Sequence, residues 1–328
     1  MAAVGMRRGT RTRRAERARA AALLAAAVTM ALAAACTAPG GTHDDGRPPD
    51  PSPSTRHHGA VLAVKIDNAR AARPQTGLNA ADIVYAEQVE GGLSRLMAVY
   101  ATDMPKAVGP VRSARESDLE LLRQFERPTL AFSGAQKKLL PLIDAAPLRP
   151  ETPGKVSGAF YRGTDRPAPH NLYLRPDRLL PTAPGRDALT TGFRYGARPA
   201  GGTAATSRTV RFPAATFTFT WSDALHGYRV SMDGTPTVTT DDGPVAPPTV
   251  VVQYVKVHPS AFHDFLGNHT PYTETVGSGR AEVLRDGRAY DVTWERPTPA
   301  DGTRFTTRDG TPVNFAEGQV WVVFASAS

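Results

Sequence analysis

The chain contains a single cysteine, Cys36, so it cannot form an internal disulfide. Cys36 follows an uncharged run rich in Ala and Leu over residues 20–35, and seven arginines precede that run. A basic segment, a short apolar segment and small residues before a cleavage point are typical of a secretory signal. An uncleaved membrane anchor is the alternative, but the run is too short and too rich in alanine for a good spanning helix. We therefore predict a signal peptide over residues 1–35.

The residues around Cys36 resemble the lipobox of bacterial lipoproteins, in which the cysteine thiol carries a lipid. The match departs in one position, because Leu32 stands four residues before the cysteine rather than the usual three. Residues 36–58 are rich in Pro, Gly, Ser and Asp and show no apolar periodicity, which is typical of a disordered tether. We expect lipidation of Cys36 and a protein anchored in the cell membrane, on its outer, extracytoplasmic face.

The positive charge of the chain lies mostly in the predicted signal. Residues 1–35 carry seven Arg and one Glu, which is +6 of the formal net charge of +8 and leaves the remainder near +2. A basic chain usually suggests nucleic-acid binding. Here the excess belongs to the signal, so we expect no nucleic-acid partner.

Two domains are expected after the tether, with the boundary in the Gly-rich segment over 196–209. The first, over 59–196, mixes strand and helix patterns and predicts an α/β domain. Its helix should run over 113–125, because Ser113 and Glu116 have the spacing of a capping box. Its strands are expected at 61–66, 82–89, 93–100 and 129–133, with the turn Glu90-Gly91-Gly92 between the second and third.

The second domain, over 210–328, shows almost only strand patterns. Asp286-Gly287 and Asp309-Gly310 are strong hairpin signals between β-branched or aromatic runs. Short strands at this spacing predict a sandwich or an open barrel. The whole chain is therefore expected to have a mixed α+β fold, an α/β domain followed by a β-rich one. The expected strands lie at 216–221, 228–232, 249–258, 281–284, 289–294, 303–307, 312–315 and 319–324.

The densest group of polar residues in the first domain suggests an anion site. Arg112 and Arg115 bracket the expected helix start at Ser113, where free N–H groups favour anions. Two guanidinium groups there can hold a carboxylate or phosphate in bidentate fashion. The alternative is that these arginines pair with acids of the protein itself. The ligand-binding candidates are Asp67, Arg73, Glu90, Arg95, Arg112, Ser113 and Arg115.

A catalytic interpretation rests on a smaller set of residues: Glu87, Glu90, His170 and Asn171. Two neighbouring acids can have pKa values driven apart, and a histidine in a loop can act as a general base. The chain has no G-x-S-x-G, S-x-x-K or phosphate-binding loop. Its histidines lack a ligand motif such as H-E-x-x-H, so we expect no metal and no cofactor.

Several runs resemble the YerB-like lipoprotein family over nearly all of residues 60–328. The family implies an α/β domain followed by a β-rich domain behind a lipoprotein signal, but no biochemical activity, because its function is unknown. The shared motifs contain Arg73, Glu90, Arg95, Arg112, Ser113, Arg115, His170 and Asn171. The runs that carry the resemblance are RPQTGLNAADIVYAEQVEGGLSRLMAVY (73–100), VGPVRSARESDLEL (108–121), APHNLY (168–173), VGSGRAEVLRDGRAYDVTWERP (276–297) and GQVWVVF (318–324).

Three classes of function remain open. The leading expectation is a cell-envelope protein that binds an anionic or carboxylate-bearing ligand, such as a cell-wall fragment, through the first domain. The second is a hydrolase or lyase of envelope polymers that uses Glu87 or Glu90 and His170. The third is a scaffold for protein partners in the membrane. We favour binding over catalysis.

Overall fold

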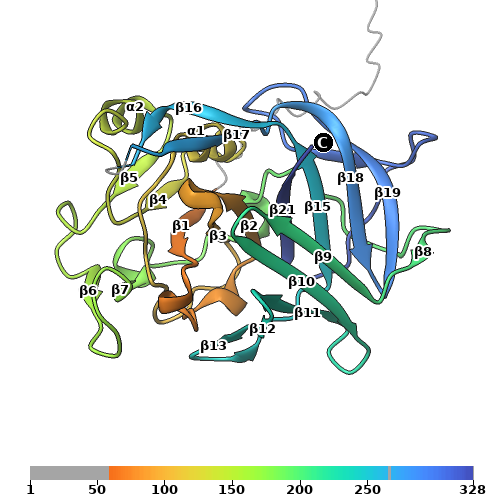
Figure 1. The fold of residues 1–328 in the computed structure, drawn as a ribbon, viewed down its shortest axis with the longest axis horizontal. Coiled ribbons are helices and arrows are strands. Elements are labelled where there is room, and N and C mark those ends of the chain that lie inside the picture. Colours follow the sequence, from red (N-terminus) through yellow and green to blue (C-terminus); the bar gives the residue numbers. More distant parts are fainter. Residues whose placement is uncertain (1–58, 265–266, 328) are drawn as a thin grey trace, which may run out of the picture. The chain divides into compact units, whose positions relative to one another are not determined.

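The computed structural model describes residues 59–264 and 267–327 (Figure 1). The predicted signal peptide, Cys36 and the tether over 36–58 lie outside the described residues. Within the described part, no helix combines the length and apolar character needed to cross a membrane.

Eleven strands form one mixed sheet that draws on both halves of the chain. The C-terminal strand β21 (Val320–Ser326) lies between β15 (Thr249–Val255) and β2 (Ile83–Gln88) and is parallel to both. The predicted mixed α+β class is confirmed, whereas the division into two domains remains a prediction. The other strands of this sheet are β1 (Leu62–Asp67), β3 (Ser94–Tyr100), β4 (Thr129–Ala131), β5 (Arg149–Glu151), β8 (Thr203–Ala204), β18 (Gly277–Arg285), β19 (Arg288–Arg296) and β20 (Arg304–Thr306).

Smaller antiparallel sheets and short helices surround this sheet. A four-stranded sheet contains β9 (Ser207–Phe212), β10 (Ala215–Ser222), β11 (Gly227–Met232) and β12 (Thr235–Pro236). Three strand pairs are β6 (Phe160–Arg162) with β7 (Leu172–Leu174), β13 (Val238–Thr239) with β14 (Gly243–Pro244), and β16 (Val257–His263) with β17 (His269–Thr273). The helices are α1 (Glu116–Leu122), α2 (Leu140–Ala145), η1 (Arg70–Ala72), η2 (Leu78–Ala80), η3 (Glu90–Gly92), η4 (Pro176–Arg178) and η5 (Arg186–Ala188).

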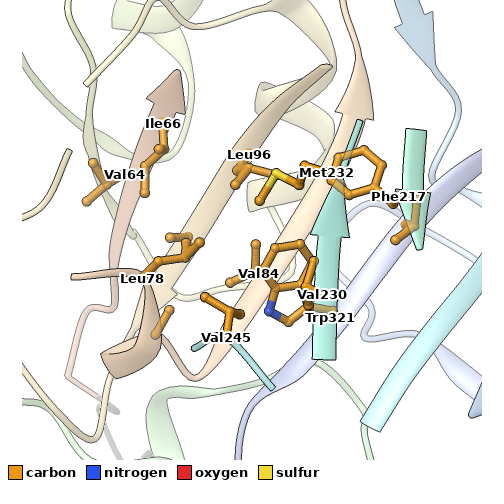
Figure 2. Close-up of a cluster of buried hydrophobic side chains, with 14 of the residues drawn as sticks. Val64, Ile66, Leu78, Val84, Leu96, Phe217, Val230, Met232, Val245 and Trp321 are labelled. Carbon is orange, nitrogen blue, oxygen red and sulfur yellow. The ribbon is translucent and has the colours of Figure 1, made fainter. Parts of the chain in front are cut away.

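The central strands of the large sheet are buried on both faces, which explains the nearly continuous apolar sequences of β1, β2, β3, β15 and β21. On one face it packs against the four-stranded sheet. The rings of Phe217 and Phe219 meet Trp321 edge-on, at centroid distances of 6.4 and 6.1 Å. Figure 2 shows Phe217 and Trp321 with Val230 and Met232 of the smaller sheet and Leu96 of the large one.

The opposite face packs against α1, and its side chains change from apolar to charged at the end of β1. Leu121 and Leu122 of α1 join a buried cluster with Ala63 and other residues of β1 to β3. Because successive strand residues alternate between faces, the next residues of β1 on this side are Lys65 and Asp67. The apolar face therefore ends in a charged cluster, beside the β16–β17 hairpin that Figure 1 shows next to α1.

Most predicted hairpins are confirmed, but two local predictions are wrong. Asp286 and Gly287 join β18 to β19 with φ of 51° and 68°, as a tight hairpin turn requires. The second Asp-Gly turn is closed by one bridge, Thr306 to Pro312, with the Thr307 N–H donating to the Thr311 carbonyl, but the strand expected over 312–315 is not formed. The helix expected over 113–125 occupies only Glu116–Leu122.

Candidate functional site

A row of charged side chains crosses three neighbouring strands at the end of the sheet. Asp67 of β1 lies opposite Arg95 of β3, and Arg95 lies opposite Glu87 of β2. Directly paired residues share a face, and their Cβ atoms are about 5 Å apart. The strand register alone therefore gathers three predicted candidates on one face.

Lys65 forms the buried base of this cluster. Its side chain is fully buried, and Nζ lies 2.8 Å from Asp118 Oδ1 and also contacts Glu87. Burial lowers the pKa of Lys65 to about 8, although the charge of Asp118 opposes this effect. Glu87 is thus committed to an ion pair in the interior, which makes it a structural residue in this arrangement rather than a free base.

A loop running beside β1 brings Arg112 to Asp67. Val111 bridges to Ile66, and the Arg112 N–H donates to the Lys65 carbonyl at 2.8 Å. Arg112 Nε then lies 3.1 Å from Asp67 Oδ2. His170, which precedes β7, places Nδ1 2.8 Å from the same oxygen. Asp67 therefore holds two predicted site residues that are far apart in the sequence.

Arg115 is held firmly by Glu90. Its second terminal nitrogen donates to Oε2 at 2.7 Å, and its Nε lies 2.7 Å from Oε1. The hydroxyl of Thr270 donates to Glu90 Oε1 at 2.6 Å. Burial raises the pKa of Glu90, but hydrogen bonding and charge from Arg115 outweigh it and leave the pKa below its usual value. Internal pairing, the alternative to ligand binding, therefore accounts for Arg115.

Arg95 and Arg112 keep most of their donors available. A guanidinium has five N–H donors. Arg95 donates to the Ser113 carbonyl at 3.1 Å, and Arg112 contacts Asp67 through Nε alone, with its side chain 26% exposed. Neither guanidinium has another hydrogen bond or ion pair with the part of the chain that the structure describes. These two arginines, rather than Arg112 with Arg115, are suited to receive an anion.

A cavity of about 390 Å³ adjoins the cluster on the side of Ser113 and Arg115. Its apolar wall includes Leu139 and Phe262, and Glu90 contributes to its polar part. Arg115 and Glu90 of the cluster line this cavity, whereas Arg95 and Arg112 are not among its lining residues.

The start of α1, where the sequence suggested an anion site, is occupied by acids of the protein itself. The helix begins at Glu116, and its first turn already carries the carboxylates of Glu116 and Asp118. The Arg115 N–H donates to Asp118 Oδ2 at 2.7 Å. Because the protein's own acids occupy the helix start, attraction for an anion must come from the guanidinium groups.

Three other predicted residues have their polar atoms largely engaged. Arg73 donates to Asn68 and to Asp233, the latter at 2.9 Å, and so connects η1 to the β11–β12 turn. The Asn171 amide accepts from Arg162 at 2.9 Å and donates to the Gly163 carbonyl at 2.8 Å. The Ser113 hydroxyl lies 3.3 Å from that of Ser133.

Sequence reasoning missed Asp118 and Thr270 as members of the cluster, and it counted Lys65 in the polar region of the first domain without making it a site candidate. A charged residue inside the apolar run of β1 was a usable signal for Lys65, because a buried lysine needs a carboxylate partner. Asp118 looked like an ordinary residue of a helix. Thr270 comes from β17, 180 residues from Glu90, and nothing local in the sequence points to that contact.

Comparisons with known proteins place most of the chain in a family. Residues 48–189 match the model "Protein of unknown function (DUF3048) N-terminal domain", and residues 208–322 match the corresponding C-terminal domain. The chain is 25% identical over 280 residues to "Putative lipoprotein YerB" of Bacillus subtilis, covering 80% of each protein. The crystal structure of YerB protein from Bacillus subtilis shares the fold, with a TM-score of 0.66 and 21% identity, over 81% of this chain and 90% of that one.

Proposed function

The chain belongs to the DUF3048 family, and we propose that it is a lipid-anchored envelope protein that binds an anionic, carboxylate-bearing ligand at Arg95 and Arg112. The relative named as a lipoprotein supports membrane anchoring, and Cys36 is the residue proposed to carry the lipid. In this proposal the folded part faces outward from the membrane.

The observation that carries the proposal is the set of unused guanidinium donors. Arg95 and Arg112 face the same charged row, and Asp67 fixes Arg112 through one atom only. A carboxylate can accept two parallel N–H bonds from one guanidinium, which is short-range and geometrically specific. Because the surrounding acids balance the cations, recognition rests on these hydrogen bonds rather than on a large net charge.

The position of the cluster also favours a binding site. The parallel strands β1 and β4 both end beside it. Ligands of open α/β sheets bind outside the carboxyl ends of such strands. The adjoining cavity provides space for the remainder of a wall fragment.

Co-sedimentation with isolated cell walls tests the proposal. The full chain is expected to sediment with walls, and Arg112→Gln is expected to lose most of that binding while remaining folded. Arg229→Gln, at an exposed position on β11, is the matched control and should bind like the wild type. Equal binding by all three proteins would contradict the proposed site.

Anchoring is tested separately. The Cys36→Ala protein is expected to leave the membrane fraction, whereas the wild type should remain in it until detergent is added. Retention of the variant in the membrane fraction would contradict lipidation at Cys36.

An enzymatic role is the second candidate, and the Asp67–His170 contact favours it. A carboxylate bound to Nδ1 fixes the tautomer of a histidine and leaves Nε2 for proton transfer. Incubation of wall fragments with wild type and His170→Gln tests this candidate. Product formed by the wild type and abolished in the variant, with wall binding retained, would establish catalysis. Absence of product with both proteins would leave binding as the function.

A further inference from the structure

Helix α2 combines an apolar sequence with an exposed position. Five of its six residues are apolar, Asp144 being the exception, yet Ile143 alone among the six is buried. Leu140 and Leu142 are 37% and 47% exposed. A helix that is apolar on nearly all sides is normally buried inside a protein. The part of the chain that the structure describes leaves α2 uncovered, so we expect a surface outside this chain to cover it.

The exposed apolar residues of α2 adjoin one another. Successive residues of a helix are rotated by about 100°, so Pro141 and Ala145 lie opposite the buried Ile143, with Leu140 and Leu142 on either side. We call Leu140, Pro141, Leu142 and Ala145 the α2 surface. Single exposed apolar residues are normal, whereas adjoining ones mark interaction sites. The other strongly exposed large apolar residues of the described part lie on separate elements, at Leu93, Leu225 and Val238.

Cations border the α2 surface. Lys137 and Lys138 lie just before α2 and are exposed, and neither has an ion pair with the residues that the structure describes. Asp144, the one acid of α2, lies 3.3 Å from Lys155 Nζ. The net charge at this place is therefore positive. Apolar side chains bordered by lysines are suited to the interface of an anionic lipid bilayer, where the apolar part enters the membrane and the ammonium groups meet the headgroups.

The chain enters the fold close to α2. Leu62 of β1 and Arg149 of β5 both pair with Thr129 of β4 in parallel register, so the starts of these strands lie side by side. Neighbouring strands are about 4.8 Å apart, which places the start of β1 about 10 Å from that of β5. Ala60 and Leu148 line the same cavity. Figure 1 shows α2 beside β5, which it directly precedes, so the predicted lipid anchor is joined to the fold near α2.

We infer that the α2 surface docks on the lipid bilayer to which the protein is anchored. The apolar residues enter the boundary between headgroups and acyl chains, and Lys137 and Lys138 contact anionic headgroups. This contact restricts the folded part to one orientation on the membrane. The inference rests on the proposed anchoring through Cys36, which keeps α2 close to the bilayer, and it is independent of the ligand site at Arg95 and Arg112.

Flotation with lipid vesicles tests the inference on the mature chain, residues 36–328, carrying Cys36→Ser. This chain contains every described residue but lacks the basic signal and the lipid, so neither can bind the vesicles. The vesicles contain phosphatidylcholine alone or phosphatidylcholine and phosphatidylglycerol in equal parts. We expect binding to the anionic vesicles and binding about tenfold weaker or more to the neutral ones, because each basic residue near an anionic surface strengthens binding about fivefold. Failure of this binding would leave the separate test of anchoring at Cys36 unaffected.

Two double variants locate the contact. Leu140→Gln/Leu142→Gln removes the apolar contact, and Lys137→Gln/Lys138→Gln removes the charge. Each should weaken binding to the anionic vesicles about tenfold or more. Both should remain folded, because the positions are exposed and glutamine forms helices as readily as leucine and lysine. Leu225→Gln, which is 42% exposed in the β10–β11 turn, is the matched control and should bind like the parent chain.

A fluorescent label shows whether α2 itself enters the membrane. The Cys36→Ser chain has no other cysteine, so Leu142→Cys and Leu225→Cys each provide one labelling position for an environment-sensitive dye. Anionic vesicles should shift the emission of the dye at position 142 to the blue and leave that at position 225 unchanged. Absence of vesicle binding, undiminished binding by either double variant, or equal shifts at both positions would overturn the inference. Dimers in analytical ultracentrifugation that only the leucine variant loses, without vesicle binding, would assign the α2 surface to a second copy of the chain instead.

Discussion

Asp67 Oδ2 lies 2.8 Å from His170 Nδ1, although 103 residues separate the two along the chain. The same oxygen lies 3.1 Å from Arg112 Nε, and the other oxygen accepts the Ala69 N–H at 3.1 Å. Asp67 is almost fully buried at the end of β1. One carboxylate therefore fixes the two side chains that the sequence assigned to two different functions.

This arrangement predicts that Asp67→Asn disturbs both neighbours. The amide keeps the size of the side chain but loses the charge that Arg112 and His170 face. We expect weaker wall binding and an unfolding free energy lower by about 1–3 kcal/mol, because hydrogen bonds to a charged group are lost in a buried place. Urea unfolding and co-sedimentation measure the two effects. Asp103→Asn, at an exposed position, should change neither.

The buried ion-pair network predicts a large loss of stability for Lys65→Met. The substitution keeps an apolar stem but leaves Glu87 and Asp118 without their shared cation. Removing one partner of a buried pair costs about 3–5 kcal/mol, because an uncompensated charge remains. Chemical denaturation measures the loss, and the exposed Lys106→Met is the control. A loss as small as that of the control would mean that the network contributes little.

The lowered pKa of Glu90 predicts a specific acid sensitivity. Because the folded pKa lies below the usual 4.5, the Glu90–Arg115 pair stabilises the fold above that value and is lost as the pH falls through the folded pKa. Glu90→Gln should therefore be less stable than the wild type near neutral pH, and this difference should shrink on acidification. Thermal unfolding across the acidic range measures it. A difference independent of pH would contradict the assigned role of the charge.

Local structure could be predicted from the sequence, and long-range placement could not. The turns at Glu90-Gly91-Gly92 and Asp286-Gly287 follow from residues that adopt positive φ, and both hairpins are present. The insertion of β21 between β2 and β15 has no local signal, because apolar strands of this kind fit any buried position in a sheet.

The same limit applies to the site. The β2–β3 hairpin places Glu87 opposite Arg95, but Asp67 joins them only through the pairing of β1 with β3, which no turn signal specifies. The pairing of Arg115 with Glu90 depends on where α1 starts, and α1 starts at Glu116 rather than at the capping-box signal of Ser113. The available donors of Arg95 and Arg112 emerge only from the three-dimensional contacts.

Substitution of Gly77 by alanine should destabilise the fold more than the same substitution at Gly91. Both have positive φ, 76° and 67°, which costs a residue with a side chain about 1–2 kcal/mol. A Cβ on Gly77 would also lie 2.3 Å from the Ala107 carbonyl oxygen, whereas a Cβ on Gly91 would meet nothing within 4 Å. Gly77→Ala should therefore be clearly less stable than Gly91→Ala in parallel melting experiments. Equal melting temperatures would show that the Ala107 segment moves aside freely.

The most direct test of the proposed function compares wall binding before and after the carboxylates of the walls are converted to amides. The account predicts that the full chain sediments with untreated walls and largely fails to sediment with amidated ones, while Arg112→Gln binds both weakly. Undiminished binding of the wild type to amidated walls would contradict recognition of a carboxylate by Arg95 and Arg112.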